Sequence, residues 1–68
     1  MELLSERECD MIITFAESSM KLSAVCRKMD TDSAVISRRF DRIKERTGLD
    51  ARNFYDLVSL VEMARRQP

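Results

Sequence analysis

Residues 22–50 read LSAVCRKMDTDSAVISRRFDRIKERTGLD, and this stretch carries the strongest structural signals in the chain. Apolar residues at helical spacing predict a short helix over 23–29 and a longer one over 33–47. Between them, the Asp-Thr-Asp run at 30–32 favours a turn, because these side chains prefer caps and turns to helix interiors. A short helix, a turn and a longer helix form the helix-turn-helix arrangement. Its core stripes here consist of Val25, Cys26, Met29, Ile36, Phe40 and Ile43.

Capping residues set the expected ends of these two helices. Ser23 is a preferred N-cap residue for the short helix. Asp32 or Thr31 is expected to cap the longer helix for the same reason. Gly48 is expected to end it, because glycine readily adopts the left-handed backbone conformation.

A further helix is predicted on each side of this unit. The run Ser5-Glu6-Arg7-Glu8 is a capping box, and the apolar positions after it predict a helix over 6–19. Asp50 or Asn53 is expected to cap a fourth helix over 53–65. The apolar stripe expected on that fourth helix consists of Phe54, Leu57, Val58 and Val61, widened by Leu60 and Ala64.

Length and composition limit the class of protein. The chain has 68 residues, of which 44% are apolar, so we expect a single domain over 1–68 with one small core. One Gly and one Pro leave few sharp turns, which favours the all-α class. No apolar run approaches the roughly 18 residues that cross a bilayer, and the N-terminus lacks the pattern of a signal peptide. A cytoplasmic location without a membrane partner is therefore expected.

The residue types argue against catalysis and against metal binding. The chain contains no His, the commonest general base, and no Gly-rich phosphate loop. Cys9 and Cys26 lack the further ligands of a zinc site, so we expect two reduced thiols that serve as small apolar core residues. No enzyme activity, no metal and no cofactor are expected.

The net charge of zero conceals an uneven distribution along the chain. Residues 1–20 contain one basic and five acidic residues, a net charge of −4. Residues 21–48 contain eight basic and four acidic residues, a net charge of +4, whereas residues 49–68 contain three of each sign. The basic segment coincides with the predicted helix-turn-helix. This basic segment is suited to binding the phosphate groups of a nucleic acid. The acidic first helix is expected to point away from that ligand.

The outer face of helix 33–47 is the predicted DNA-contacting surface. At about 100° per residue, its side chains opposite the apolar stripe include donors suited to base edges. Asp41 and Glu45 also lie on this face, in the second half of the helix, where they would repel DNA. The N-terminal half of the helix is therefore expected to contact the bases. The base-reading candidates are Ser33, Ala34, Ser37, Arg38 and Arg42. The phosphate-binding candidates are Ser23, Arg27, Lys28, Arg39, Lys44 and Arg46.

Segment 22–57 resembles the C-terminal helix-turn-helix of PucR- and CdaR-type bacterial transcription regulators. The matching residues are Leu22, Ser23, Arg27 and Met29, then Ile36, Arg39, Phe40, Arg42 and Ile43, and finally the run Thr47-Gly48-Leu49-Asp50. The run Asn53-Phe54-Tyr55-Asp56-Leu57 also looks like part of small stand-alone bacterial proteins that bear this domain. The resemblance implies double-stranded DNA as a partner and a role in transcription regulation.

The chain departs from that family where the family's recognition helix begins. The family usually has His-Arg-Asn-Thr at the positions that here read Asp32-Ser33-Ala34-Val35. Of the donors that could read bases there, only Ser33 remains, whereas Arg38 stands where the family often has Tyr. The resemblance therefore carries over the fold but not the family's choice of DNA sequence.

Two functional hypotheses follow from these patterns. The first is a sequence-specific DNA-binding regulator that forms a homodimer through its first or its fourth helix, because one unit this small makes few contacts. The second is a protein–protein interaction module that keeps the fold without reading DNA, motivated by Asp32 and by the apolar pair Ala34-Val35. A regulatory protein is a further expected partner, since the chain carries no sensing domain of its own.

Overall fold

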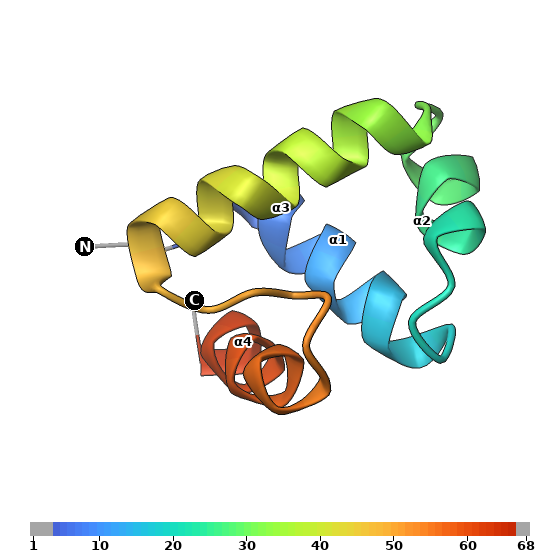
Figure 1. The fold of residues 1–68 in the computed structure, drawn as a ribbon. Coiled ribbons are helices and arrows are strands. Elements are labelled where there is room, and N and C mark those ends of the chain that lie inside the picture. The colour runs from blue at the N-terminus through green and yellow to red at the C-terminus, as the bar shows by residue number, and fades with distance from the viewer. Residues whose placement is uncertain (1–3, 67–68) are drawn as a thin grey trace.

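The computed structural model describes residues 4–66, which form four α-helices joined by turns (Figure 1). The helices are α1 (Glu6–Glu17), α2 (Leu22–Met29), α3 (Ser33–Thr47) and α4 (Phe54–Arg66). Within the described range there is no strand, and the predicted all-α class is confirmed. In the ribbon, α1 runs between α3 and α4; it packs against α2 and α4, and α2 packs against α3.

One apolar core is shared by all four helices. The rings of Phe15 in α1 and Phe40 in α3 have centroids 5.0 Å apart and tie these two helices together. Truncating a buried phenylalanine such as Phe40 to alanine costs about 3–5 kcal/mol of folding free energy. The predicted stripe on α3 is confirmed. The largest fully buried side chains are Phe40, Leu4, Met11, Ile12, Ile36, Ile43, Leu60 and Val25.

The predicted caps of α1 and α3 are confirmed. The Ser5 hydroxyl accepts a hydrogen bond from the backbone N–H of Glu8, whose carboxylate accepts one from the backbone N–H of Ser5. Of the two alternatives for α3, Asp32 is the cap, and its carboxylate accepts the N–H of Val35 at 3.0 Å. Gly48 ends α3 at a φ of 77°, in the left-handed region that favours glycine.

The first helix ends two residues before the prediction of 6–19. The backbone turns left-handed at Ser19 and Met20, where φ is 60° and 64°. Just before this turn, the hydroxyl of Ser18 donates to the carbonyl of Phe15, so the serine closes the helix instead of continuing it. The helix therefore ends at Glu17, and the two serines that follow belong to the turn.

The second helix begins at Leu22, so the prediction that Ser23 is its N-cap is wrong. Lys21 occupies the cap position and makes no side-chain cap hydrogen bond. Instead, the backbone N–H of Lys21 donates to the hydroxyl of Ser18 at 3.3 Å. One serine thus ends α1 and supports the start of α2, which leaves Ser23 exposed inside the first turn.

The fourth helix runs over Phe54–Arg66, one residue later than the predicted 53–65. Asn53 precedes it, and its side-chain oxygen accepts the N–H groups of Tyr55 at 3.0 Å and Asp56 at 3.2 Å. Of the two predicted caps, Asn53 therefore serves the helix. Asp50 lies farther back, in the connection from α3.

The predicted apolar stripe of α4 is wrong at two positions. Leu57, Leu60 and Ala64 are buried against the core, but Phe54 is 60% exposed and Val58 is 44% exposed. Apolar residues occupy more than half of the circumference of this helix, so their spacing leaves open which part faces inward. Packing against α1 selects the side that carries Leu60.

Candidate nucleic-acid interface

The outer side of α3 has two flanks, one next to the N-terminal turn of α1 and one next to the connection between α3 and α4. Burial of Ile36, Phe40 and Ile43 fixes the rotation of the helix. Ser33 and Ala34 are consequently exposed at its N-terminal end. With 15 residues, α3 is about 22 Å long, which is enough to cross a DNA major groove about 12 Å wide.

The flank of α3 next to α1 is basic. Arg38, Arg39 and Arg42 line a shallow hollow together with Ser5 of the α1 cap and Glu8, whose carboxylate is paired with Arg46. Arg39 also lines a neighbouring hollow that includes Arg7, from the first turn of α1, and Asp30, at the end of α2. We call Arg7, Arg38, Arg39 and Arg42 the basic flank. It joins three of the predicted DNA-contacting arginines to a fourth from another helix.

These four arginines have no competing partner among residues 4–66. Among the described residues, 4–66, no hydrogen bond or ion pair involves their side chains, and Arg38 and Arg42 are exposed. A guanidinium presents donors in a planar fork that matches phosphate oxygens and guanine edges. The basic flank is therefore available to an anionic ligand without breaking an internal ion pair.

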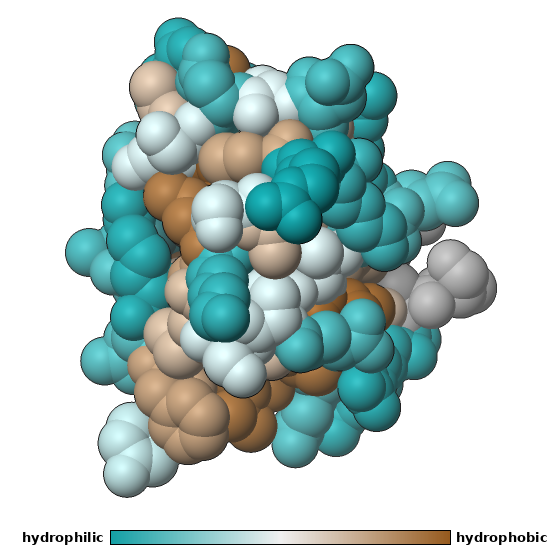
Figure 2. All heavy atoms as spheres, turned by 90° about the vertical axis from the view of Figure 1, so that its right-hand side faces the viewer, coloured by the Kyte–Doolittle hydropathy of each residue, from teal (hydrophilic) through white to brown (hydrophobic). Residues whose placement is uncertain are grey.

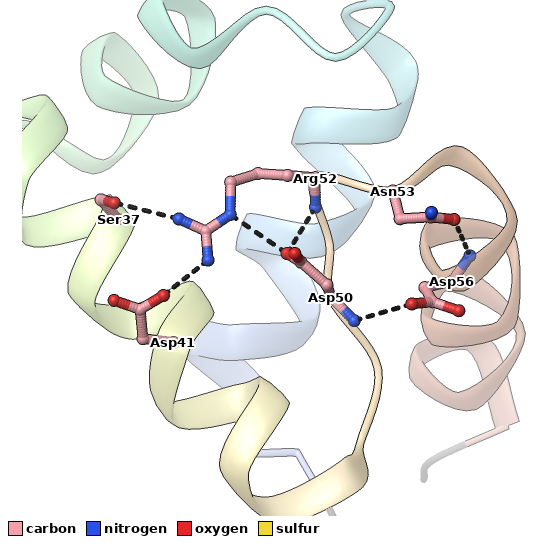
Figure 3. A network of polar contacts seen from close by, with 6 residues as sticks. All are labelled: Ser37, Asp41, Asp50, Arg52, Asn53 and Asp56. Carbon is pink, nitrogen blue, oxygen red and sulfur yellow. Dashed lines mark hydrogen bonds and ion pairs between the residues drawn. The ribbon is translucent and has the colours of Figure 1, made fainter.

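The opposite flank of α3 is occupied by Arg52 from the connection to α4 (Figure 3). The Arg52 guanidinium donates to Asp41 Oδ1 at 2.5 Å and to the hydroxyl of Ser37 at 3.2 Å. Its Nε and its backbone N–H both donate to Asp50 Oδ1, at 3.1 and 3.0 Å. Ser37, a predicted base reader, is thus held by an internal hydrogen bond, and the acidic Asp41 on the outer face is paired.

This network continues to the start of α4 (Figure 3). The backbone N–H of Asp50 donates to Asp56 Oδ2 at 3.1 Å, so the connection is bound to the first turn of α4. The hydrogen bonds from Arg52 lower the pKa of Asp50, and the contacts with Asp41 and then Asp50 raise the pKa of Arg52. Both shifts favour the charged forms of Asp50 and Arg52.

The C-terminal half of α3 is tied to α1 by an ion pair. Glu8 pairs with Arg46, and the carboxylate is only 13% exposed. Burial raises the pKa of Glu8, but the hydrogen bonds from Arg46 and from the backbone of Ser5 outweigh burial and lower it. The prediction that the acidic first helix points away from the basic segment is therefore wrong at this carboxylate, because the amino end of α1 lies beside α3.

The structure separates four of the other predicted phosphate ligands from the basic flank, whereas the fifth, Arg46, lines a further hollow with Arg42. Arg27 and Lys28 are exposed in the last turn of α2, and Ser23 is exposed in its first turn. Lys44 is close enough to Asp50 to help lower its pKa, which places it on the flank that Arg52 occupies. Arg46 is engaged with Glu8. None of these five residues lines the two hollows of the basic flank.

Sequence reasoning missed two arginines. Arg7 lies within the capping-box run, which is a signal for a helix start and not for a ligand contact. Only the packing of α1 beside α3 brings Arg7 close to Arg39. Arg52 lies 11 residues beyond Asp41 and 15 beyond Ser37, so no local pattern connects them. The one available signal was Asp50, which closes a turn onto the N–H of Arg52 two residues on.

Comparisons with protein-family models, with curated proteins and with solved structures found no match for this chain. Within residues 4–66, none of the helices has the length and apolar character that crossing a membrane requires.

Proposed function

We propose that this chain binds double-stranded DNA through α3 and acts as a bacterial transcription regulator in the cytoplasm. One observation carries the proposal: four arginines from two helices form a continuous flank and have no ionic partner among the described residues. Phosphate contacts supply much of the affinity of DNA-binding proteins, and arginine is well suited to them.

The residues divide into two roles on this proposal. Arg38 and Arg42, on the exposed side of α3, approach base edges in the major groove, and Ser33 and Ala34 enter first at the helix start. Arg39, on the side of α3 that faces α1, and Arg7, in the first turn of α1, contact the phosphate backbone. Ser37 stays bound to Arg52 and contributes to the position of the helix instead of reading a base.

The neutralised Asp41 removes an obstacle to this docking mode. Its carboxylate lies on the outer side of α3, where it would repel phosphate. The ion pair with Arg52 offsets that charge within the protein. Of the two acidic residues that the sequence places on this face, Asp41 is therefore compensated by an arginine from another segment.

The experiment is a titration of a random-sequence duplex pool, with recovery and sequencing of the bound fraction. We expect the double variant Arg38→Ala with Arg42→Ala to bind at least about tenfold more weakly and to lose base preference. The matched control is Lys21→Ala with Arg66→Ala, which also removes two exposed positive charges but leaves α3 intact. Equal losses in both variants, or no binding by the parent chain, would refute the proposal.

The alternative is a protein–protein interaction module that uses the same fold without DNA. On that alternative, binding of a protein partner would be insensitive to nuclease and to Arg38→Ala with Arg42→Ala. The absence of duplex binding at low salt, together with such a partner, would favour it.

A further inference from the structure

An apolar stripe runs along the exposed side of α4. Phe54, Val58 and Val61 recur at intervals of four and three residues, and Arg65 continues the row four residues later. This spacing keeps side chains on one seam of a helix, as in helices that pair side by side. Beside the seam, Tyr55 is 80% exposed. We call Phe54, Tyr55, Val58, Val61 and Arg65 the α4 seam.

The seam borders a groove between α1 and α4. The groove is lined by Ala16 of α1 and by five residues of α4, namely Leu57, Val58, Val61, Glu62 and Arg65. Figure 2 shows apolar atoms gathered at the lower edge of the molecule, the height at which α4 lies in Figure 1. Adjacent exposed aromatic and aliphatic side chains of this kind mark interaction surfaces in small soluble proteins.

The distribution of charge along the seam favours a second copy in antiparallel orientation as its occupant. The amino end of the seam carries the two aromatic rings, which contact each other edge to face with centroids 5.6 Å apart. The carboxyl end carries Arg65. In an antiparallel pair each arginine meets the partner's rings, an attractive cation–π contact. In a parallel pair, Arg65 of one copy would instead lie beside Arg65 of its partner.

The register follows from the same spacing. If Val58 of one copy packs against Val61 of its partner, Phe54 lies opposite Arg65, because both pairs are centred on the same point of the helix. The two-fold axis then crosses α4 between Val58 and Val61, and the surface is self-complementary, as a two-fold dimer requires. We infer that this chain forms an antiparallel homodimer through the α4 seam.

The expected dimer is weak. A helix of 13 residues is about 20 Å long, so one pair of helices buries less than the roughly 800 Å² per partner of a standard interface. The inference does not depend on DNA binding. We therefore expect a monomer–dimer equilibrium that is measurable without DNA, with a dissociation constant in the micromolar range or above.

Sedimentation equilibrium of the full chain over a wide concentration range tests the inference. Val58→Asp places a charge in the seam and should weaken dimerisation at least about tenfold. Ser59→Asp is the matched control, because it adds the same charge to the neighbouring exposed residue outside the seam, and it should leave the equilibrium unchanged. A chain that stays monomeric to millimolar concentration, or equal effects of both variants, overturns the inference.

Disulfide trapping distinguishes the two orientations. In a background of Cys9→Ala and Cys26→Ala, checked by circular dichroism, Val61→Cys lies near the two-fold axis and should crosslink on oxidation. Arg65→Cys should crosslink poorly, because the two copies of this position lie about 16 Å apart along an antiparallel pair. Equal crosslinking at both positions, or crosslinking at Arg65→Cys alone, would overturn the antiparallel arrangement.

Discussion

The two flanks of α3 differ in how their charges are used. On the flank next to α1, Arg38, Arg39 and Arg42 have no ionic partner within residues 4–66. On the flank next to α4, Arg52 is bound to Asp41 and to Asp50. The difference teaches that positive charge alone does not mark a ligand site. Arginines with internal partners hold the fold together, and those without them remain available to a ligand.

This comparison has a direct consequence for mutants. A change on the basic flank should alter ligand affinity and leave folding nearly intact, since exposed arginines contribute little to stability. A change on the Arg52 flank should lower stability, because it releases the connection that positions α4, and should alter ligand affinity only through the charge of Asp41. Measuring both quantities in each variant therefore separates the two roles.

Charge reversal on the basic flank should have the largest effect on duplex binding. We expect Arg38→Glu with Arg42→Glu to weaken duplex binding by about a hundredfold or more, because two attractions become repulsions. Fluorescence anisotropy of a labelled duplex measures the affinity, and urea unfolding measures stability, which should change by less than about 1 kcal/mol. A loss of stability as large as the loss of binding would mean that the flank is structural.

Removal of Arg52 should act on stability first. We expect Arg52→Ala to lower the free energy of unfolding by about 1–2 kcal/mol, since it breaks hydrogen bonds to Asp41, Ser37 and Asp50 at once. It also exposes the charge of Asp41, so duplex binding should weaken as well. In the double variant with Asp41→Asn, binding should recover while stability does not. Recovery of neither quantity would contradict the role assigned to the ion pair.

Arg7 tests whether α1 extends the basic flank. We expect Arg7→Ala to weaken duplex binding by about threefold to tenfold at low salt without changing base preference, as a phosphate contact should. Lys21→Ala, which removes one exposed positive charge before α2, is the matched control for the change of net charge. An unchanged affinity for Arg7→Ala would confine the interface to α3.

The smallest expected effect concerns the pair formed by Glu8 and Arg46. The pKa of Glu8 is lowered from its ordinary value of 4.5, so its ion pair contributes stability above that value and loses it as pH falls through the lowered pKa. Glu8→Gln should therefore be less stable than the parent chain at pH 7, by less than about 1 kcal/mol. The difference should shrink towards pH 3. A difference that is independent of pH in urea titrations would contradict this assignment.

The sequence predicted what depends on local chemistry. Three helix ends were predictable because each depends on groups only a few residues apart in the sequence. They are the capping box at Ser5, the cap at Asp32 and the stop at Gly48. The apolar stripe of α3 was equally visible, because polar residues occupy most of the other positions of that helix. These features were sufficient for the all-α class and the positions of the helices.

Features that depend on tertiary packing were not predictable. Arg46 meets a carboxylate 38 residues away, and Arg52 meets one 11 residues away. The rotation of α4 also depends on its neighbour, because apolar residues surround much of that helix. The sequence therefore identified arginines as candidates but could not say which of them the fold would engage.

The dependence of duplex affinity on salt tests the central claim most directly. If Arg7 and Arg39, the phosphate ligands of the basic flank, each neutralise one phosphate, the logarithm of the association constant should fall with the logarithm of salt concentration with a slope of about −1.8. For Arg7→Ala, the slope should become shallower by about 0.9. A slope near zero for the parent chain, or the same slope for both proteins, would contradict the account.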